Sequence, residues 1–499
     1  MIQDRNIKLK HVLVLISVAV LTSSLLTAQY VMSQSSTVTI ERGSFQTPVA
    51  YTIFLDGSVF KARNQWGQIE FSGSDVAAII NQAITAAKDG SAIVIQPSDS
   101  LFILNNYINI NKNINFYLYA SLKLRDNFPD PQGIHISADD ATIYIYRFDG
   151  NKANNPSEIQ GVVVAGAQNT KIFIHTLNFG YADVVLYAPS NDWNKNVELS
   201  GLFENSGGVG LNSVIYLNLY NDNIVISGFV KNVSGASGQA LYNNALGIVT
   251  LKDFKVQNST STNAVLDTRA NTRLFIENVE VNNTGSDGLV VHQGAIVQAN
   301  NLHIKGVGIL EYGIENLGTF LGSNIYIENG NRNFMSRGGS DYVSISNFYF
   351  ENPNVWSVII NTDSAGNHSF TNGKIVAPYG IRDDAPSGSK SRFTNVDLTE
   401  VTETKVYGSP ILVGIVGFVT ENHGSTPLGS QSRDWISHGL AGTPQTIQLT
   451  VEATVPIITS VKEKNSTHFQ IGIWFVNGTE VYGADKTSYN VFWYAKYRP

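Results

Sequence analysis

The chain has 499 residues, enough for two or more domains, and only 15% of them are charged. Glycine occurs 43 times, cysteine is absent, and the formal net charge at pH 7 is -7. This composition is typical of a chain rich in strands and turns. It excludes disulfides and thiolate metal sites, and the negative charge argues against nucleic acid as a partner.

Residues 1–35 have the pattern of a secretory signal. Three basic residues within the first ten precede an apolar stretch from His11 to Leu26, and the small residues Thr27, Ala28 and Ser33 follow it. A basic n-region, an apolar h-region and a small-residue cleavage zone predict export, with an uncleaved membrane anchor as the alternative. Either interpretation places the rest of the chain outside the cell, secreted or at the cell surface.

Residues 36–131 are predicted to form an N-terminal cap and the first coils of a repeat. The stretch SGSDVAAIINQAITAAKDG predicts one amphipathic helix, with Ser74 or Asp75 as its N-cap and Gly90 as its end. Two strand-like stretches, SAIVIQ and LFILNNYINI, follow it. A solenoid requires such a cap, because its terminal coil would otherwise expose apolar core to water.

A short sequence motif repeats through the middle of the chain: two alternating apolar positions, an asparagine, and two more alternating apolar positions. Successive asparagines are 23, 23, 23, 25 and 23 residues apart. A fixed period of this length indicates a solenoid, and alternation on both sides of the asparagine indicates two short strands. The repeated asparagines are Asn278, Asn301, Asn324, Asn347, Asn372 and Asn395.

Asparagine suits a sharp corner, because apart from glycine it tolerates the left-handed backbone region best. Stacked at one corner of successive coils, asparagine side chains can also hydrogen-bond to each other. We therefore predict an all-β fold with a right-handed parallel β-helix of about eleven coils over residues 132–420.

The repeat ends near residue 400. Residues 406–419 are expected to form the closing strands, and the polar stretch 421–431 is expected to be a linker. Residues 432–499 alternate again without the coil period, which predicts a small β-sandwich. Such a domain could bind sugar, trimerise the chain or cap the helix.

The opening "FSGSD…INQAI…DG.AIVI", followed by coils and the turn Asp149-Gly150-Asn151, resembles the pectate-lyase-like right-handed parallel β-helix superfamily over residues 70–400. That superfamily includes polysaccharide lyases, glycoside hydrolases, phage tailspikes and proteins without known activity. The resemblance therefore implies a fold and a carbohydrate ligand, and leaves the activity open.

Counting fourteen residues from each corner predicts one column of side chains on successive coils. Asp267 and Glu315, two coils apart, would be separated by about 9.5 Å, because parallel strands are about 4.8 Å apart. That is the upper end of the spacing of an inverting glycosidase pair, about 6.5–9.5 Å. The predicted catalytic residues are therefore Asp267, Glu315, His292 and the neighbouring Arg337. The column comprises Ile215, Tyr242, Asp267, His292, Glu315, Gly338 and Asn361.

A second candidate is Asn361-Thr362-Asp363 with Asp383-Asp384. The pattern is similar to that of polygalacturonase-type hydrolases, but the Gly-His-Gly and Arg-x-Lys motifs of those enzymes are absent. Asn361 and Asp363 are therefore candidate substrate-binding residues. The alternative is that both clusters are ordinary turns, which are often rich in Asn and Asp.

Calcium is a third possibility, because some β-helix lyases hold Ca²⁺ between acidic side chains. Asp139-Asp140 and Asp149-Gly150-Asn151 could supply oxygen ligands, although Asx turns explain both clusters equally well. We predict no cofactor or metal, with Ca²⁺ as the alternative.

Aromatic side chains can stack on sugar rings, and three are candidates for substrate binding: Trp193, Tyr187 and Tyr242. Trp193 stands among polar residues in the insertion 188–196, where the sequence shows no core for it to fill.

The sequence thus predicts an exported, carbohydrate-active β-helix protein that binds an extended polysaccharide or cell-surface glycan. Cleavage by hydrolysis or β-elimination is the enzymatic form of this hypothesis. The alternative is a non-catalytic surface or adhesion protein that uses the β-helix as a stiff spacer. A homotrimer, and membrane anchoring through the N-terminal segment, remain open.

Overall fold

The structure is a computed structural model. It describes residues 47–497, apart from 156–157, 189–191, 208–212, 235–237, 261, 309–310, 340–341, 387–389, 418–420, 429–433, 439, 441–442, 454, 466 and 482–488. The predicted signal or anchor, residues 1–35, lies outside the described residues. Among the residues described, none of the helical segments has the length and apolarity to cross a membrane.

The N-terminal cap contains the predicted helix and three strands that the sequence did not indicate. Strands β1 (Val49–Asp56), β2 (Val59–Asn64) and β3 (Ile69–Gly73) pair antiparallel and precede helix α2 (Val76–Ala86). Asp75 caps the helix, because its carboxylate accepts a hydrogen bond from the Ala77 N–H at 3.0 Å. The predicted apolar face is buried in the core that the first coils share, which confirms the cap; it comprises Val76, Ile79, Ile80, Ala83, Ile84 and Ala87.

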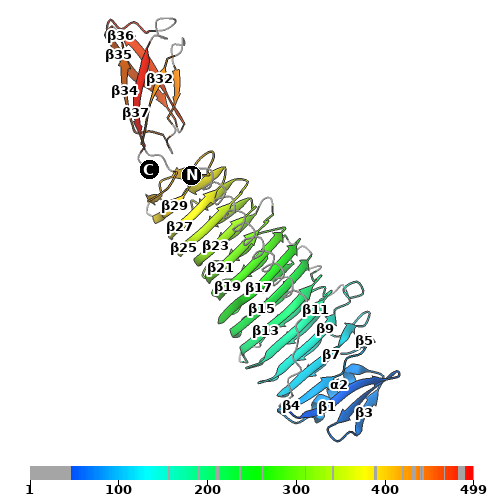
Figure 1. Cartoon of the computed structure of the whole chain (residues 1–499). Coiled ribbons are helices and arrows are strands. Elements are labelled where there is room, and N and C mark those ends of the chain that lie inside the picture. Colours follow the sequence, from blue (N-terminus) through cyan, green and yellow to red (C-terminus); the bar gives the residue numbers. More distant parts are fainter. Residues whose placement is uncertain are drawn as a thin grey trace, which may run out of the picture. The chain divides into compact units, whose positions relative to one another are not determined.

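Two long sheets form the body, which confirms the predicted all-β parallel β-helix; it has about 12 turns (Figure 1). In each coil one strand joins the large sheet and one joins the small sheet, and both pair in parallel with the next coil. The coil strands of the large sheet are β4 (Ser91–Ile95), β5 (Phe102–Leu104), β7 (Ile114–Leu124), β9 (Thr142–Asp149), β11 (Lys171–Leu177), β13 (Asn194–Glu204), β15 (Asn221–Val233), β17 (Ile248–Ser259), β19 (Arg273–Thr284), β21 (Ile296–Lys305), β23 (Thr319–Glu328), β25 (Tyr342–Glu351), β27 (Asn367–Val376), β29 (Lys390–Asp397) and β31 (Ile411–Val413). The small sheet comprises β6 (Ile108–Ile110), β8 (Gln132–Ile136), β10 (Gln160–Val164), β12 (Ala182–Leu186), β14 (Ser213–Leu217), β16 (Gln239–Asn243), β18 (Leu266–Thr268), β20 (Leu289–Val291), β22 (Tyr312–Asn316), β24 (Arg332–Ser336), β26 (Trp356–Ile360), β28 (Tyr379–Asp383) and β30 (Val406–Gly408).

The repeated asparagines are the corners of the coils, as predicted. All six have a positive φ, between 52° and 60°. Asn301 donates to the Asn278 side chain at 2.9 Å, and Asn278 donates to Asp253 one coil earlier at 3.0 Å. Asn324 instead donates to Asn300. The corners therefore combine a left-handed backbone with side-chain hydrogen bonds that run along the stack.

A second row of asparagine corners lies at the C-terminal ends of the large-sheet strands, and the period of the first row does not reveal it. Asn205, Asn232, Asn258 and Asn283 all have a positive φ. Each of the last three donates a hydrogen bond to the asparagine one coil earlier, at 3.1 to 3.3 Å. Each coil in this part of the helix is thus fixed at two corners.

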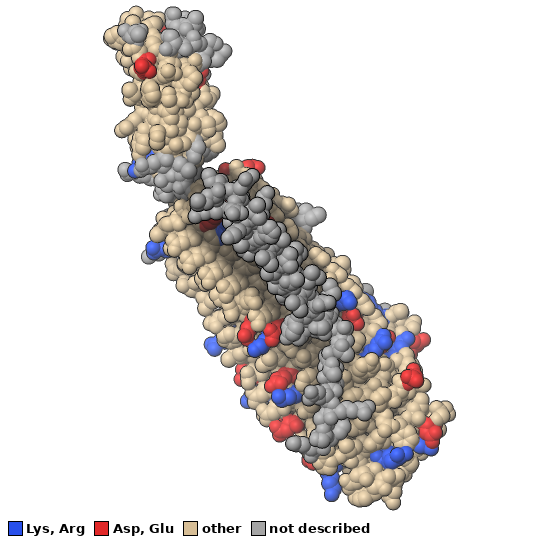
Figure 2. Space-filling view, in the orientation of Figure 1, with Lys and Arg blue, Asp and Glu red and all other residues tan. Residues whose placement is uncertain are grey.

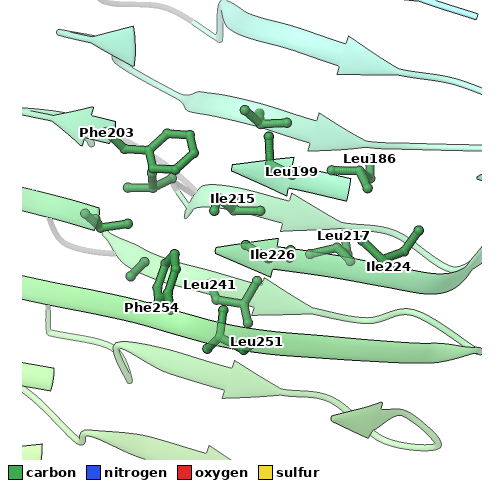
Figure 3. Close-up of a cluster of buried hydrophobic side chains, with 14 of the residues drawn as sticks. Leu186, Leu199, Phe203, Ile215, Leu217, Ile224, Ile226, Leu241, Leu251 and Phe254 are labelled. Atoms are coloured by element: carbon green, nitrogen blue, oxygen red, sulfur yellow. The ribbon is translucent and has the colours of Figure 1, made fainter. Parts of the chain in front are cut away.

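Apolar side chains from both sheets fill the interior of the coils (Figure 3). Leu217 and Leu241 from the small sheet and Ile226 and Leu251 from the large sheet are fully buried. Burying each such side chain contributes about 1.5–3 kcal/mol. The surface carries paired charges between neighbouring strands, for example Lys255 with Glu280 at 2.9 Å, and Figure 2 shows such groups on a mainly uncharged surface.

The C-terminal residues form two three-stranded antiparallel sheets, β32-β37-β34 and β33-β36-β35. Side chains from both sheets share one core, which includes Ile436, Phe469 and Trp493. The linker predicted over 421–431 is wrong for its first part, because Glu421–Pro427 is strand β32 and pairs with β37. The other strands are β33 (Asp434–Ser437), β34 (Thr446–Glu452), β35 (Ile457–Lys464), β36 (His468–Phe475) and β37 (Asn490–Lys496).

The left-handed backbone at Asn278 predicts different effects for two substitutions of this residue. Asn278→Gly loses the side-chain hydrogen bonds but keeps access to the left-handed region. Asn278→Ala loses both, and the left-handed backbone costs an alanine about 1–2 kcal/mol. We expect the alanine variant to have the lower melting temperature in thermal unfolding followed by circular dichroism. Equal melting temperatures would show that the left-handed backbone at this corner contributes nothing to stability.

Candidate active site

The face of the small sheet opposite the core carries one column of side chains in register. Leu266, Leu289 and Ile314 point into the core, and the residue after each belongs to this outer column. The column runs Tyr216, Tyr242, Asp267, Val290, Glu315, Met335, Ile359, Arg382 and Tyr407. The structure therefore confirms that Tyr242, Asp267 and Glu315 share one column.

Three side chains contact the carboxylate of Asp267. Gln239 Nε2 donates to Oδ2 at 2.6 Å, and Arg269 Nη2 lies 3.1 Å from the same oxygen. His292 Nε2 lies 3.0 Å from Oδ1. Asp267 is only 4% exposed, and Ser213 orients Gln239 through a 3.0 Å hydrogen bond. Contacts of this kind fix the position of a carboxylate.

Glu315 has a different environment. It is 6% exposed, and its carboxylate forms an ion pair with Arg337. Burial raises the pKa of Glu315 above its usual range, while Arg337 and His292 act in the opposite direction. Burial is the largest of these effects, so the pKa of Glu315 is raised overall.

The two carboxyl groups are separated by two strand spacings. Asp267 on β18 pairs in register with Val290 on β20, which pairs with Glu315 on β22. At about 4.8 Å per strand, their attachment points are about 9.5 Å apart. This agrees with the spacing expected from the sequence.

The predicted positions of four other residues in the column are wrong. Ile215 is buried in the core, and Tyr216 takes its place in the outer column. Val290 replaces His292 between the two carboxyl groups, and Met335 and Ile359 occupy the positions given to Gly338 and Asn361. The reason is that the loops between the sheets differ in length from coil to coil, so a constant offset from the corner fails. His292, two residues after Val290, still contacts Asp267, and Arg337 contacts Glu315.

Sequence reasoning missed an acidic group beside this pair. Asp287 lies just before β20 and accepts a 2.7 Å hydrogen bond from the Tyr312 N–H. Burial, with Glu315 and Glu311 nearby, raises the pKa of Asp287 to about 7. No sequence motif marks Asp287, because its pKa depends on burial and on neighbours one coil away.

Aromatic rings continue the column on one side of the carboxyl groups. Tyr216 and Tyr242 stack in parallel, with centroids 4.9 Å apart, and the Arg269 guanidinium lies 4.9 Å from the Tyr242 ring centroid. Tyr187 is 46% exposed after β12. Trp193 packs edge-to-face on Tyr220 at 5.4 Å, so it has the packing partner that the sequence did not reveal.

The Asn361-Thr362-Asp363 motif follows β26, two strands beyond Glu315. Asn361 Oδ1 accepts a hydrogen bond from the Thr362 N–H at 2.9 Å, while Asp363 is exposed. Asp384 forms an ion pair with Arg382 at 2.5 Å. Asp383 accepts a hydrogen bond from the Ala385 N–H, and burial raises its pKa. Turn hydrogen bonds and a local ion pair therefore account for much of this motif.

The clusters considered for calcium are engaged in turns. Asp139 accepts from the Gln168 N–H at 2.8 Å, and Asp140 accepts from the Asn169 side chain at 2.9 Å. Asp149 accepts from the Asn151 N–H at 2.8 Å. Within the described part of the chain, no group of three or more His, Asp or Glu side chains could hold a metal ion.

A shallow groove of about 590 Å³ lies on the large sheet, away from this column. Phe275, Gln298, Leu321 and Tyr342 are among the residues that line it. Its one carboxylate, Glu277, forms an ion pair with Lys252, so the groove lacks the acid and base pair of the small sheet.

Comparisons with known proteins find no matching family profile and no matching curated protein. Similar solved structures are phage tailspikes. The tailspike of E. coli bacteriophage HK620, in complex with a pentasaccharide, is 11% identical with a TM-score of 0.44, covering 85% of this chain and 90% of that one. Tailspike gp61 of Pseudomonas phage phi297 is 8% identical with a TM-score of 0.38, covering 85% and 92%. Tailspike gp49 of Pseudomonas phage LKA1 is 10% identical with a TM-score of 0.30, covering 82% and 66%. At these values the similarity assigns no activity, and the fold rests on the strand pairing above.

The ion pair between Glu315 and Arg337 predicts that replacing Arg337 lowers the stability of the protein more at high pH than at low pH. Folding raises the pKa of Glu315, so its contribution to stability is present at low pH and declines as pH rises through the folded-state pKa. Arg337→Met leaves a buried carboxylate without its counter-charge at pH 8, whereas protonation removes more of that charge at pH 5. We expect a larger drop in melting temperature at pH 8 than at pH 5. Lys171→Met, which breaks an exposed ion pair, is the control and should show no such difference. The same drop at both pH values would contradict this electrostatic role.

Proposed function

We propose that the protein binds an extended polysaccharide along the outer column of the small sheet and hydrolyses a glycosidic bond with inversion at the anomeric carbon. The observation that carries this proposal is the placement of Asp267 and Glu315 in one column, two strand spacings apart, in different electrostatic environments. A pair at this distance leaves room for a water molecule beside the sugar.

In this proposal Glu315 is the general acid. Its raised pKa favours the protonated form, which delivers its proton to the glycosidic oxygen as the bond to the anomeric carbon breaks. Asp267 is the general base and takes a proton from the water that attacks the opposite face of the sugar. Arg269 and His292 position Asp267, and Arg337 positions Glu315.

The ion pairs of Arg269 and Arg337 favour hydrolysis over β-elimination. A β-elimination at this site would require a free base to remove a proton from the sugar ring. Arg269 and Arg337 are both held in ion pairs with carboxyl groups, which favours a positioning role for them. The stacked rings of Tyr216 and Tyr242, one strand from Asp267, provide a flat apolar surface for a neighbouring sugar.

The proposal also includes export, a family relationship, an oligomeric state and further substrate contacts. The basic and apolar pattern of residues 1–35 supports export to the medium or the cell surface, with a membrane anchor as the alternative. The opening stretch of the cap and the Asp149-Gly150-Asn151 turn support a relationship to pectate-lyase-like proteins. A homotrimer is compatible with binding along the β-helix. Tyr187, Trp193, Asn361 and Asp363 remain candidate substrate contacts in neighbouring coils.

The test is a screen of the whole protein on neutral and acidic polysaccharides, with both reducing ends and unsaturated products measured. We expect new reducing ends without unsaturated products. Asp267→Asn and Glu315→Gln should each lower kcat at least 100-fold, because a positioned acid or base contributes about 10²–10⁴-fold. Glu277→Gln, in the groove on the large sheet, is the matched control and should retain activity.

Two outcomes would contradict the proposal. Activity that survives in the double variant Asp267→Asn/Glu315→Gln would exclude these residues as the acid and base. The absence of activity on every polysaccharide would favour the non-catalytic spacer.

A further inference from the structure

The C-terminal sandwich has one sheet whose outer face carries two tryptophans. Phe469, Ile471 and Ile473 of β36 are fully buried, so the alternate residues of this strand lie on the outer face. Trp474 is one of these residues and is only partly buried. Trp435, on the neighbouring strand β33, is 46% exposed.

The indole of Trp474 lies across the backbone of Gly472. A Cβ at that glycine would come within 2.3 Å of the Trp474 ring, so any larger residue would displace the indole. The Lys462 ammonium lies 4.0 Å from the ring centroid, and Ile458, directly opposite Trp474 on β35, is 52% exposed. Gly472 thus allows the ring to lie against the sheet.

Polar groups with unmet hydrogen-bonding capacity lie next to both indoles. Gln470 is directly opposite Trp435 and only 8% exposed, yet its Oε1 has no hydrogen-bond partner among the described residues. Glu480 forms a bridge with Trp474, and its Oε1 likewise has no partner within the described part of the chain. A buried acceptor left unpaired costs about 1–3 kcal/mol. Both oxygens are closed off from solvent, so a ligand hydroxyl can pair with them, and remove that cost, only when the Gln470 or Glu480 side chain turns outward.

We propose that this face of the sandwich is a glycan-binding site, separate from the column on the β-helix. A pyranose presents apolar C–H groups to an aromatic ring and hydroxyls around its edge. Two indoles with acceptors beside them match that chemistry. Gln470 and Trp474 are four residues apart on one strand, or about 13 Å, so the face suits a short stretch of polysaccharide.

A glycan fits this face better than a protein partner does. The apolar groups are interrupted by the amide of Gln470, the carboxylate of Glu480 and the ammonium of Lys462. A protein interface would bury a more continuous apolar centre with fewer charged groups.

The test is native affinity electrophoresis of the full chain in gels that contain hydroxyethylcellulose, xylan, galactomannan, dextran or polygalacturonate. The Tyr242→Ala background removes the tyrosine platform proposed on the β-helix. We expect this variant to be retarded by at least one polysaccharide, and Tyr242→Ala/Trp474→Ala to bind it at least ten-fold more weakly. Gln470→Ala should weaken binding in the same direction. Phe492→Ala, an exposed aromatic on the other sheet of the sandwich, is the matched control and should leave the retardation unchanged.

Two results would overturn this proposal: no retardation in any gel, or equal retardation of the Trp474→Ala and Phe492→Ala variants. Circular dichroism confirms that each variant is folded. The proposal does not depend on catalysis, since a chain that cleaves nothing can still be retarded through Trp474. Conversely, cleavage that depends on Asp267 can occur in a chain whose sandwich binds nothing.

Discussion

Each coil of the β-helix must return to the same position one strand spacing further along, and the asparagine corners make that return possible. At Asn278 and its equivalents the backbone enters the left-handed region, which most residues avoid, while the amide side chain reaches the same corner of the preceding coil. The corner is therefore both a bend and a contact between coils. Without it, the alternating apolar residues on its two sides could not all face one interior, and the continuous core of both sheets would be lost.

The same constraint creates the candidate site. Parallel pairing without a shift repeats a side-chain position at every coil, so polar residues at one position become close neighbours although they are distant in sequence. Asp267 and Glu315 differ in the side chains around them, which come from the same coil and from neighbouring coils. Asp267 receives Gln239, Arg269 and His292, whereas the environment of Glu315 is dominated by burial. A uniform scaffold can therefore give two carboxyl groups, whose attachment points are about 9.5 Å apart, different surroundings.

The period of the asparagines was enough to predict the β-helix, its corners and the shared column of Tyr242, Asp267 and Glu315. It could not predict the loop lengths between the sheets, which is why His292 was placed in the column itself. No sequence pattern reveals Asp287, because its raised pKa depends on burial and on carboxyl groups of the next coil. Strand β32 was mistaken for a linker because it is a polar edge strand that ends at Pro427, and its pairing with distant β37 leaves no local signal.

The central claim is that Asp267 and Glu315 act on opposite faces of one sugar. The most direct measurement is the anomeric configuration of the first product, followed by proton NMR before mutarotation on a polysaccharide that the protein cleaves. Attachment points about 9.5 Å apart predict a product with the opposite configuration to the bond that was cleaved. A product that retains the configuration would contradict this assignment, because retention requires a nucleophilic carboxylate much closer to the acid.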